Sequence, residues 1–480
     1  MILKRFYEEK LAQASYLVGC SSTKEAIVID ANRDVDQYLQ EATKEGLRIT
    51  AVTETHIHAD YVSGSRELAE RTGGRLFLSG EGDAEWQYAF PERENLVLVK
   101  HGDVIDVGKL RLEVLHTPGH TPEHISFLTR DLSVSDKPLC VFTGDFVFVG
   151  DVGRPDLLER AANYKGTMEV GARALFESLQ KFQTNPDYLM IFPGHGAGSA
   201  CGKSLGAIPV STLGYEKYSN WAFSIPESKK FVEMILEGQP EPPKYFAQMK
   251  KINKLGPPIL GGLRIPPRLP GDRLFEILEK DELLVDIRSA GEAALGFVPG
   301  AFNIPLDESF TTWAGWLLDY EKPIYLLANA EEDVSEAVRD LTLIGLDDVR
   351  GWLGKDALRA YERRYVALEI VPQITAEQMY QRYQSKEVEI LDVRGASEYR
   401  MGHIPGARHV PLGYLAEHVA EIPKDKPLVV HCSGGARSSI GISVLRKLGF
   451  KNTINLTGGF MEYEAEGLPV EREEKAEIGV

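Results

Sequence analysis

The strongest constraint on the fold is an internal repeat in the second half of the chain. LLVDIRSAGEAALGFVPGAFNIPL (residues 283–306) aligns without a gap with EILDVRGASEYRMGHIPGARHVPL (residues 389–412). Further along, KPIYLLA (322–328) matches KPLVVHC (426–432) after a two-residue slip. A repeat of this kind predicts two homologous domains, each with short β strands alternating with helices around a mostly parallel sheet.

The rest of the chain is long enough for a further domain. With 480 residues, the protein exceeds what one hydrophobic core usually organises. Residues 239–272 are rich in Pro, Gly and Lys, which is typical of an interdomain linker. We therefore expect an α/β multidomain protein with domains at 1–245, 271–368 and 369–480 and a linker at 246–270.

Composition and charge exclude several classes of partner. The formal net charge of -17 argues against nucleic acid or an anionic membrane, because those surfaces need clustered cations. No run approaches the roughly 18 apolar residues of a membrane span, and MILKRFYEEKLAQ lacks the apolar core of a signal peptide. We expect a cytoplasmic protein without nucleic-acid or membrane partners, and a homo-oligomer such as a dimer is the default expectation.

Four apolar runs in the first domain each lead into a short loop with metal-ligand side chains. The runs are LRITAVTET, LRLEVLHTPGH, PLCVFTGD and YLMIFPGH. Loops at strand ends can bring side chains from distant parts of the sequence to one point. The ligand-type residues in these loops are His56, His58, Asp60, His120, Asp145 and His195. The sequence therefore predicts a metal site, whereas His101 and His116 lack the full context and His124 is at most a pocket residue.

These loops resemble those of the metallo-β-lactamase superfamily. The stretches that carry the resemblance are THIHADYVSG, TPGHTPEH, TGD and PGHG, and it spans roughly residues 1–240. The resemblance implies an αββα sandwich with the metal at one edge of the two sheets. Members with two metals normally have a histidine where this chain has Tyr61. The missing imidazole argues against a glyoxalase II-type hydrolase, which needs both metals to activate a bridging hydroxide.

Within the superfamily, persulfide dioxygenases hold one non-haem iron with two histidines and one aspartate. Carried over to this sequence, those ligands are His56, His120 and Asp145. A set of two imidazoles and one carboxylate leaves positions for O2 and substrate and suits one iron(II) ion, although zinc stays open. The neighbours that would orient these ligands by hydrogen bonds, or serve as alternative ligands, are His58, Asp60 and His195.

Two further residues near this site have competing interpretations. Arg154, in GDVGRPDLL, resembles a dioxygenase arginine near the acidic groups of the substrate and is a candidate for binding a carboxylate. A surface arginine without a role is the alternative. Cys201, six residues after His195, is either a buried structural thiol or a relay that accepts or presents sulfur. Cys20 and Cys140 lie in apolar runs and are expected in the core.

The C-terminal domain carries a second candidate site. In PLVVHCSGGARSSIGISVLRKLG, a strand leads through a small-residue loop into a helix, which favours an anion-binding nest of backbone N–H groups. The loop CSGGAR resembles the active-site loop of rhodaneses, which carry sulfane sulfur on a cysteine, and the upstream DVR and GHIPGA agree. That resemblance makes Cys432 the sulfur carrier and Arg437 the residue that orients the loop or the substrate. Cys-loop phosphatases use a longer loop.

The first repeat lacks these groups. Its aligned residues read ANAEED, with Ala328 in place of the cysteine and Asp333 in place of the arginine. It resembles an inactive rhodanese-like domain, for which a packing or spacing role is expected.

Together, the parts resemble bacterial fusions of a persulfide dioxygenase with a rhodanese. The resemblance implies oxidation of a low-molecular-weight persulfide by O2 to sulfite, followed by sulfur transfer from Cys432 to give thiosulfate in sulfide detoxification. Two alternatives remain: a zinc-dependent thioester hydrolase of the glyoxalase II type with rhodanese domains, and a non-catalytic sulfur-sensing scaffold.

Overall fold

The protein divides into two compact units, which are described separately. In this computed structural model the described residues are 1–90, 95–157, 159, 166–203, 205–239, 241–365 and 367–473. Unit 1 contains Met1–Leu263 and Arg339–Gly345, and unit 2 contains Arg264–Val338 and Leu346–Val480. Within the described residues, we find no helix that combines the length and apolar character needed to cross a membrane.

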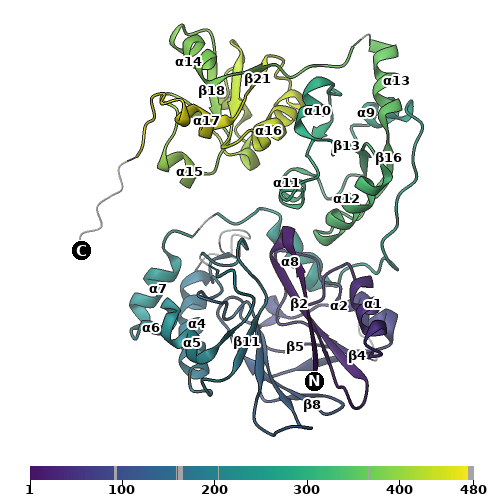
Figure 1. Ribbon diagram of the computed structural model, residues 1–480, viewed down its shortest axis with the longest axis vertical. Helices are drawn as coiled ribbons and strands as arrows, with labels where there is room; N and C mark the ends of the chain where they lie inside the picture. Colours follow the sequence, from purple (N-terminus) through teal and green to yellow (C-terminus); the bar gives the residue numbers. More distant parts are fainter. Residues whose placement is uncertain are drawn as a thin grey trace. The chain divides into compact units, whose positions relative to one another are not determined.

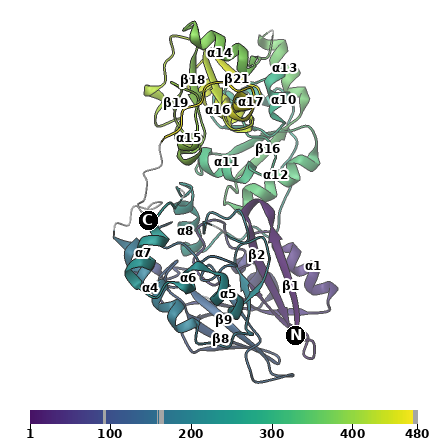
Figure 2. The ribbon, with the colours of Figure 1, turned by 60° about the vertical axis from the view of Figure 1, so that its left-hand side comes forward.

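Unit 1 is built on two six-stranded sheets. The first has the order β1-β2-β3-β4-β5-β6 and the second the order β12-β11-β10-β9-β8-β7. In the first sheet, β1 and β2 form an antiparallel hairpin, whose strands run side by side in Figure 2. The strands are β1 (Ile2–Glu8), β2 (Gln13–Gly19), β3 (Glu25–Ile29), β4 (Arg48–Thr53), β5 (Arg75–Ser79), β6 (Leu96–Val99), β7 (Val104–Val107), β8 (Leu110–His116), β9 (Ile125–Asp131), β10 (Cys140–Gly144), β11 (Met190–Pro193) and β12 (Ser211–Thr212).

Helices cover the outer face of each sheet. Helices α1 and α2 flank the first sheet, and α4 to α7 flank the second (Figure 1). Helix α4 buries Ala172, Leu175 and Leu179, a spacing that places them on one face against the second sheet. The helices are α1 (Asp36–Lys44), α2 (Ser65–Thr72), α4 (Thr167–Phe182), α5 (Leu213–Ser219), α6 (Trp221–Ser224), α7 (Ser228–Leu236) and α8 (Phe246–Leu255), with the 3-10 turns η1 (Glu9–Leu11) and η2 (Ala84–Trp86). The expected αββα sandwich is confirmed.

Aromatic side chains fill the space between the two sheets. Tyr16 of β2 lies 5.0 Å from Phe142 of β10 and 5.7 Å from Phe192 of β11, measured between ring centroids. Phe142 and Phe192 stack at 5.3 Å. The Tyr16 hydroxyl donates a hydrogen bond of 2.7 Å to the carbonyl of Pro193, so its buried polar atom is satisfied. This packing sets the separation of the strand ends that carry the predicted ligands.

Unit 2 contains the two repeats; four strands of their sheets correspond in order, and the second sheet has a fifth strand, β17, at its edge. The first sheet has the order β14-β13-β15-β16 and the second the order β17-β21-β20-β18-β19, with every pairing parallel. The strands are β13 (Leu283–Asp286), β14 (Phe302–Asn303), β15 (Ile324–Leu327), β16 (Val349–Leu353), β17 (Gln373–Ile374), β18 (Glu389–Asp392), β19 (Arg408–His409), β20 (Leu428–His431) and β21 (Thr453–Leu456).

The same buried ion pair follows the corresponding strand in each repeat. Arg288 contacts Asp286 at 2.6 Å, and Arg394 contacts Asp392 at 2.6 Å. The helices of this unit are α9 (Arg273–Glu279), α10 (Ala290–Leu295), α11 (Phe310–Leu317), α12 (Glu331–Leu343), α13 (Lys355–Tyr365), α14 (Ala376–Gln384), α15 (Ala396–Met401), α16 (Ala436–Lys447) and α17 (Gly459–Ala465), with the 3-10 turns η3 (Leu412–Tyr414) and η4 (Val419–Glu421).

The two repeats pack against each other within unit 2. The Ser439 hydroxyl of α16 donates a hydrogen bond of 3.1 Å to the side-chain oxygen of Asn303 in β14. Trp316 of α11 lies edge-on to Tyr414 of η3, with ring centroids 5.5 Å apart. The helix after the CSGGAR loop is therefore supported by the first repeat.

The predicted linker at 246–270 differs from the structure in its first half. Helix α8 occupies Phe246–Leu255, belongs to unit 1 and buries Phe246, Met249 and Asn253. Its sequence, FAQMKKINKL, has no Pro or Gly. The prolines and glycines of the surrounding segment flank the helix, and they gave the whole stretch the composition of a linker.

We predict that Phe142→Ala destabilises unit 1 by about 3–5 kcal/mol, because it removes a buried ring from the centre of the sandwich and leaves a cavity. Chemical unfolding followed by tryptophan fluorescence would measure the loss. Val134→Ala is the control, since Val134 is 83% exposed and its truncation should change little. Equal stability of the two variants would contradict this account of the core.

Candidate functional site

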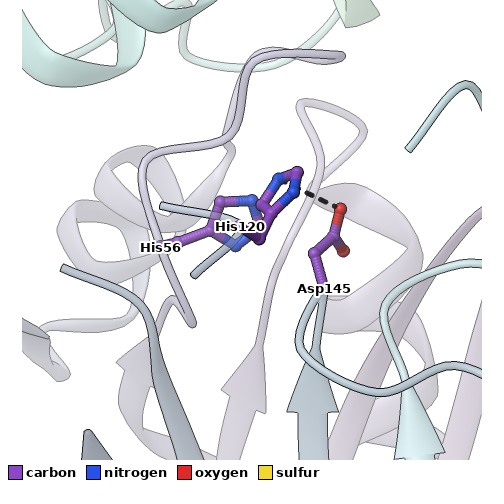
Figure 3. Close-up of side chains that lie close together, drawn as sticks. All are labelled: His56, His120 and Asp145. Carbon is purple, nitrogen blue, oxygen red and sulfur yellow. Dashed lines mark ion pairs between the residues drawn. The ribbon is translucent and has the colours of Figure 1, made fainter. Parts of the chain in front are cut away.

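Three predicted ligands meet at the edge of the sandwich. His56 follows β4 of the first sheet, whereas His120 and Asp145 follow β8 and β10 of the second. One ligand atom from each lies within 4.8 Å of the other two, and all three side chains are buried. Figure 3 shows the two imidazoles and the carboxylate facing one another, with the ion pair between His120 and Asp145.

Hydrogen bonds fix the orientation of this group. Nδ1 of His120 donates to the Arg154 carbonyl at 2.9 Å, which leaves Nε2 directed toward Oδ2 of Asp145 at 3.5 Å. Nδ1 of His56 lies 3.0 Å from the Thr55 hydroxyl. Nε2 of His56 and both carboxylate oxygens of Asp145 have no hydrogen-bond partner among the described residues. Buried polar atoms normally find a partner, so these residues fit a bound cation.

The electrostatic setting keeps the two imidazoles neutral. Burial lowers the pKa of His56 well below its usual value, and the neighbouring imidazoles of His58, His124 and His120 lower it further. Burial also lowers the pKa of His120, against the opposing effect of Asp145. A neutral imidazole offers the lone pair that a metal needs, so both residues are in the ligating form.

Close backbone approach brings the ligands of the two sheets together. Gly144, at the end of β10, has a φ of +48° and faces Thr55. A Cβ atom there would lie 2.4 Å from the Thr55 hydroxyl oxygen, so a side chain at this position would push the loops of His56 and Asp145 apart.

A second group of three ligand-type residues lies beside the first. Ligand atoms of Asp60, His195 and Cys201 also lie within 4.8 Å of one another, and all three residues are buried. Nε2 of His195 is 3.1 Å from Oδ2 of Asp60 and 3.5 Å from Oδ2 of Asp145. The structure thus brings together Asp60 and His195 as predicted and adds the thiol of Cys201.

The nearby carboxylates raise the pKa values of His195 and Cys201. Burial alone would lower the pKa of His195, but Asp145 and Asp60 outweigh it and raise the pKa well above its usual value. Burial raises the pKa of Cys201 to about 12, and the same carboxylates act in the same direction. A protonated imidazole and a neutral thiol therefore face the carboxylates when no cation is bound.

His58 and Tyr61 are held by Asp30, which the sequence did not single out. Nε2 of His58 lies 3.1 Å from Oδ1 of Asp30, and the Tyr61 hydroxyl donates to the Asp30 carbonyl at 3.2 Å. Burial opposes protonation of His58, but the Asp30 carboxylate dominates and raises its pKa to about 9. Tyr61 is fully buried beside the His58 ring. The position at which the sequence resemblance led us to look for an imidazole thus carries a phenol that is hydrogen-bonded to the backbone of Asp30.

Two further residues orient the ligand loops: Asn253, which the sequence analysis missed, and His124, which it gave at most a place in the pocket. Asn253 of α8 donates to the carbonyls of His58 and Tyr61 at 2.8 and 2.7 Å. His124 accepts a hydrogen bond of 3.1 Å from the backbone N–H of Asp145. Asn253 lies far from the motif in sequence, inside the predicted linker, so no local signal pointed to it. His124 ends the stretch TPGHTPEH, four residues after His120, and this motif was the available signal.

The side chain of Arg154 is buried and paired with a carboxylate, so it is not open to a substrate as the resemblance implied. Its guanidinium binds both oxygens of Asp156 at 2.7 and 2.8 Å and donates to the Ala200 carbonyl at 3.2 Å. The side chain is 0% exposed. The backbone of Arg154 also contacts the site: its carbonyl accepts a hydrogen bond from Nδ1 of His120, and its N–H donates to the carbonyl of Cys201. This geometry argues against a role in binding a substrate carboxylate, because the pairing with Asp156 is buried and bidentate.

A cavity of about 300 Å³ opens beside His120. Its lining is mostly apolar and includes Trp86, Pro118, Pro155 and Ala174. Such a cavity can hold the body of a small ligand while its reactive end meets the buried imidazole.

In the second repeat, Cys432 sits directly after β20, one residue beyond His431. Its thiol is buried, and the backbone N–H of Gly435 donates to its Sγ at 3.1 Å. The loop is tied to α17 because the N–H groups of Phe460 and Met461 donate to the carbonyls of Cys432 and Ser433. The predicted N–H nest around the sulfur is therefore partly formed in this structure.

Arg437 is paired with a carboxylate of α15. Its guanidinium donates to both oxygens of Glu398, at 2.6 and 2.7 Å. Burial of Glu398 would raise its pKa, but Arg437 outweighs burial and lowers it. Arg437 thus anchors the start of α16 to α15, in line with an orienting role for the loop.

The first repeat holds different groups at the matching positions. Ala328 is buried after β15, and α12 begins with Glu331, Glu332 and Asp333. Asp333 accepts a hydrogen bond of 3.2 Å from the backbone N–H of Ala330. The Asp333 carboxylate therefore caps this loop of the first repeat, whereas the corresponding loop of the second repeat is expected to bind an anion.

Comparison with known proteins decides the family. The Metallo-beta-lactamase superfamily matches residues 9–195, and the Rhodanese-like domain matches residues 375–466. Persulfide dioxygenase ETHE1, mitochondrial, from Bos taurus is 30% identical over 201 residues, covering 41% of this chain and 68% of that protein. The chain belongs to the metallo-β-lactamase superfamily. Its fusion to a C-terminal rhodanese-like domain is confirmed, and the fold implies a bound metal.

Two further proteins are similar to this member of the metallo-β-lactamase superfamily. A solved structure of a metallo-beta-lactamase from Staphylococcus aureus subsp. aureus COL is 44% identical with a TM-score of 0.66, covering 74% of this chain and 98% of that chain. A hydroxyacylglutathione hydrolase from Bradyrhizobium sp. (strain ORS 278) is 31% identical over 180 residues, covering 38% of this chain and 61% of that protein.

We predict that Gly459→Ala lowers the sulfur transfer expected at Cys432 roughly 10- to 100-fold, because its Cβ would lie 2.5 Å from the carbonyl oxygens of Cys432 and Ser433 and displace the loop. Transfer of sulfane sulfur from thiosulfate to cyanide would measure the loss. Gly467→Ala is the matched control, since Gly467 also has a positive φ but nothing lies within 4 Å of its Cβ. Equal loss in both variants would show a general stability effect.

We predict that Glu123→Gln removes a pH dependence from the stability of the metallo-β-lactamase domain. Burial raises the pKa of Glu123 from 4.5 to about 7, and its Oε1 accepts from the N–H of Ile57 between His56 and His58. Because the folded state holds the proton more tightly, stability should fall as pH rises from 4.5 to about 7, by roughly 3 kcal/mol. Unfolding of metal-free protein across this range, with exposed Glu177→Gln as control, tests the prediction; an unchanged slope in Glu123→Gln would refute it.

Proposed function

We propose that this chain oxidises a low-molecular-weight thiol persulfide with O2 to sulfite and couples the product to sulfur transfer that forms thiosulfate. The observation that carries the proposal is the buried group of His56, His120 and Asp145 in the same chain as an intact CSGGAR loop. The similarity to persulfide dioxygenase ETHE1 of Bos taurus supports small sulfur compounds as substrates.

The proposed reaction balances with water as a reactant. One persulfide, one O2 and one water give one thiol, one sulfite and two protons. The thiolate of Cys432 takes sulfane sulfur from a second persulfide, which leaves as its thiolate. Sulfite then attacks the outer sulfur of the cysteine persulfide, so thiosulfate leaves and the Cys432 thiolate returns. Coupling the two steps would consume sulfite as it forms and would serve sulfide detoxification.

The chain's own residues prepare the first step. An iron(II) ion held by His56, His120 and Asp145 would supply the redox chemistry that O2 needs. The bond from His120 to the Arg154 carbonyl directs the imidazole into the site. The apolar cavity beside His120 would bind the carrier of the persulfide and exclude water from the reacting sulfur.

The rhodanese-like domain prepares the second step. The N–H of Gly435 stabilises negative charge on Sγ of Cys432, and the helix start behind it adds to this field. The pair of Arg437 and Glu398 holds the loop in the conformation that presents these donors.

A thioester hydrolase is the second candidate. Its support is the 31% identity to the hydroxyacylglutathione hydrolase and the second group of ligand-type residues beside the first. Two adjacent cations suit activation of a hydrolytic water, whereas the dioxygenase proposal needs a single redox-active ion.

We predict that iron-loaded protein consumes O2 with glutathione persulfide and releases thiosulfate. His56→Ala should reduce O2 uptake to background, because one of three ligands is lost. Cys432→Ser should keep O2 uptake but release sulfite in place of thiosulfate, since the serine hydroxyl cannot carry sulfane sulfur. An oxygen electrode and chromatography of the sulfur products provide the measurements.

Cys140→Ser is the matched control, because Cys140 is equally buried in the core of the sandwich. It should behave like the unaltered protein in both assays. Rapid hydrolysis of S-lactoylglutathione by zinc-loaded protein without O2 uptake by iron-loaded protein would overturn the proposal in favour of the hydrolase.

A further inference from the structure

We propose that Asn455 holds the hydroxyl proton of Ser438 away from the sulfur of Cys432 and so limits how readily this cysteine acts as a nucleophile. Gln373 fixes the orientation of the Asn455 amide. The inference rests on the proposed role of Cys432 as sulfur carrier and goes beyond it, because it assigns a positioning role to residues outside the CSGGAR loop.

The Ser438 hydroxyl has more neighbours than it can serve. Its oxygen lies 3.7 Å from Sγ of Cys432, within the longer reach of hydrogen bonds that involve sulfur. It also lies 2.7 Å from Oδ1 of Asn455 and 2.9 Å from the carbonyl oxygen of Gly435. A serine hydroxyl has one proton to donate, and both of these oxygens can only accept. While Ser438 donates to either oxygen, it can meet Sγ only as the acceptor of the S–H bond.

A backbone carbonyl fixes which way round the Asn455 amide lies. Gln373 is the partner of Asn455 in the register of β17 and β21. Nε2 of Gln373 donates to the Val371 carbonyl at 3.0 Å, which leaves its Oε1 to accept from Nδ2 of Asn455 at 2.7 Å. Oδ1 of Asn455 is therefore the atom that faces Ser438. Reversing both amides would set Oε1 of Gln373 against the Val371 carbonyl, with no proton between the two acceptors.

Ionisation of Cys432 creates a second use for the Ser438 proton. The S–H proton goes to solvent, and the hydroxyl can then turn to donate to the sulfur, because a charged acceptor forms the stronger hydrogen bond. Turning breaks the bond from Ser438 to Oδ1 of Asn455. The net contribution of one such bond corresponds to roughly a three- to tenfold change in an equilibrium. Asn455 therefore opposes the reactive form of the cysteine by about this factor.

The first repeat has apolar side chains at the matching positions. Val334 aligns with Ser438 and is buried. Trp352 takes the place of Asn455, because the two residues pair with corresponding residues of the preceding strand. Arg268 bridges to Trp352 and lies over its ring at 5.2 Å, where the second repeat has its pair of amides. A buried hydroxyl is costly unless it is hydrogen-bonded, so its presence in the copy with the cysteine links it to the chemistry of that copy.

The charged groups near Cys432 have partners of their own. The guanidinium of Arg437 pairs with Glu398, and Nε2 of His431 lies 3.6 Å from Oδ2 of Asp392. Burial lowers the pKa of His431, so this imidazole is neutral at pH 7. The charged or titratable side chains of the neighbouring elements are Asp392, Arg394, Glu398, His431 and Arg437. A substitution in the amide pair leaves all of them in place.

Alkylation of Cys432 by iodoacetamide in the full-length protein tests this proposal, because it measures the reactivity of the thiolate without a sulfur substrate. Peptide mass spectrometry at pH 7 follows each cysteine separately. Asn455→Leu should raise the alkylation rate of Cys432 about three- to tenfold, since the Ser438 proton is then free to turn to the sulfur. In a Ser438→Ala background, the same substitution should change the rate less than about twofold, because no hydroxyl remains to be released.

Two glutamine variants provide a second line of evidence. Gln373→Leu should raise the rate in the same direction, because the released Asn455 amide can turn its Nδ2 to Ser438. Gln373 lies on the exposed edge strand, so this variant carries the test if Asn455→Leu does not fold. Gln381→Leu is the matched control, since Gln381 is an exposed glutamine of α14 that bonds to Glu377, and it should change nothing. Thermal unfolding checks the fold of each variant.

An unchanged rate in Asn455→Leu and Gln373→Leu, or an equal gain with and without the Ser438 hydroxyl, would overturn the proposal. The outcome is distinguishable from that of the proposed function. Protein whose alkylation follows these expectations but that transfers no sulfane sulfur would overturn the role of Cys432 as carrier and retain the restraint by Asn455. Protein that transfers sulfur while its alkylation ignores Asn455 would do the reverse.

Discussion

The N-terminal site depends on carboxylates buried where water cannot reach them. Asp145 and Asp60 lie at the junction of two sheets, and a buried carboxylate needs a cationic partner or a metal. The imidazole of His195 is such a partner without a metal, because Asp145 and Asp60 raise its pKa above the usual value. The neighbouring imidazoles of His56 and His120 stay neutral and would be free to bind a cation that takes over the negative charge. One arrangement therefore serves both folding and binding, which explains why so many titratable groups tolerate burial here.

Strand-end position is what made the proximity of the predicted ligands foreseeable. His56, His120 and Asp145 each follow an apolar strand by a few residues, and the sandwich brings those ends together. Asp30 and Asn253 escaped prediction because their roles depend on tertiary contacts: one orients His58, and the other reaches the loop of His58 from α8. Arg154 was placed near the substrate by analogy, and only the fold shows its buried partner, Asp156. Cys201 was found by proximity in sequence, but its approach to Asp60 required the structure.

The two repeats show how one scaffold separates structure from chemistry. Both keep an aspartate and an arginine paired after the corresponding strand, since this pair secures a loop in the interior. The cysteine, by contrast, is present in one copy and replaced by Ala328 in the other. The sequence alignment predicted this division, and the sheets agree in strand order. The alignment could not predict the hydrogen bond from Ser439 to Asn303. Through this bond the first repeat, which lacks the cysteine, supports helix α16 of the second.

Helix α8 sets a limit on how the protein can be dissected. It lies beyond the residues that match the metallo-β-lactamase superfamily, which end at 195. Asn253 nevertheless fastens the backbone of the histidine loop from there. A fragment that ends at residue 245 would keep every candidate ligand but lose the hydrogen bonds from Asn253 to the His58 and Tyr61 carbonyls. The metal-binding half can therefore stand alone as a module only when its C-terminal boundary is drawn beyond Leu255.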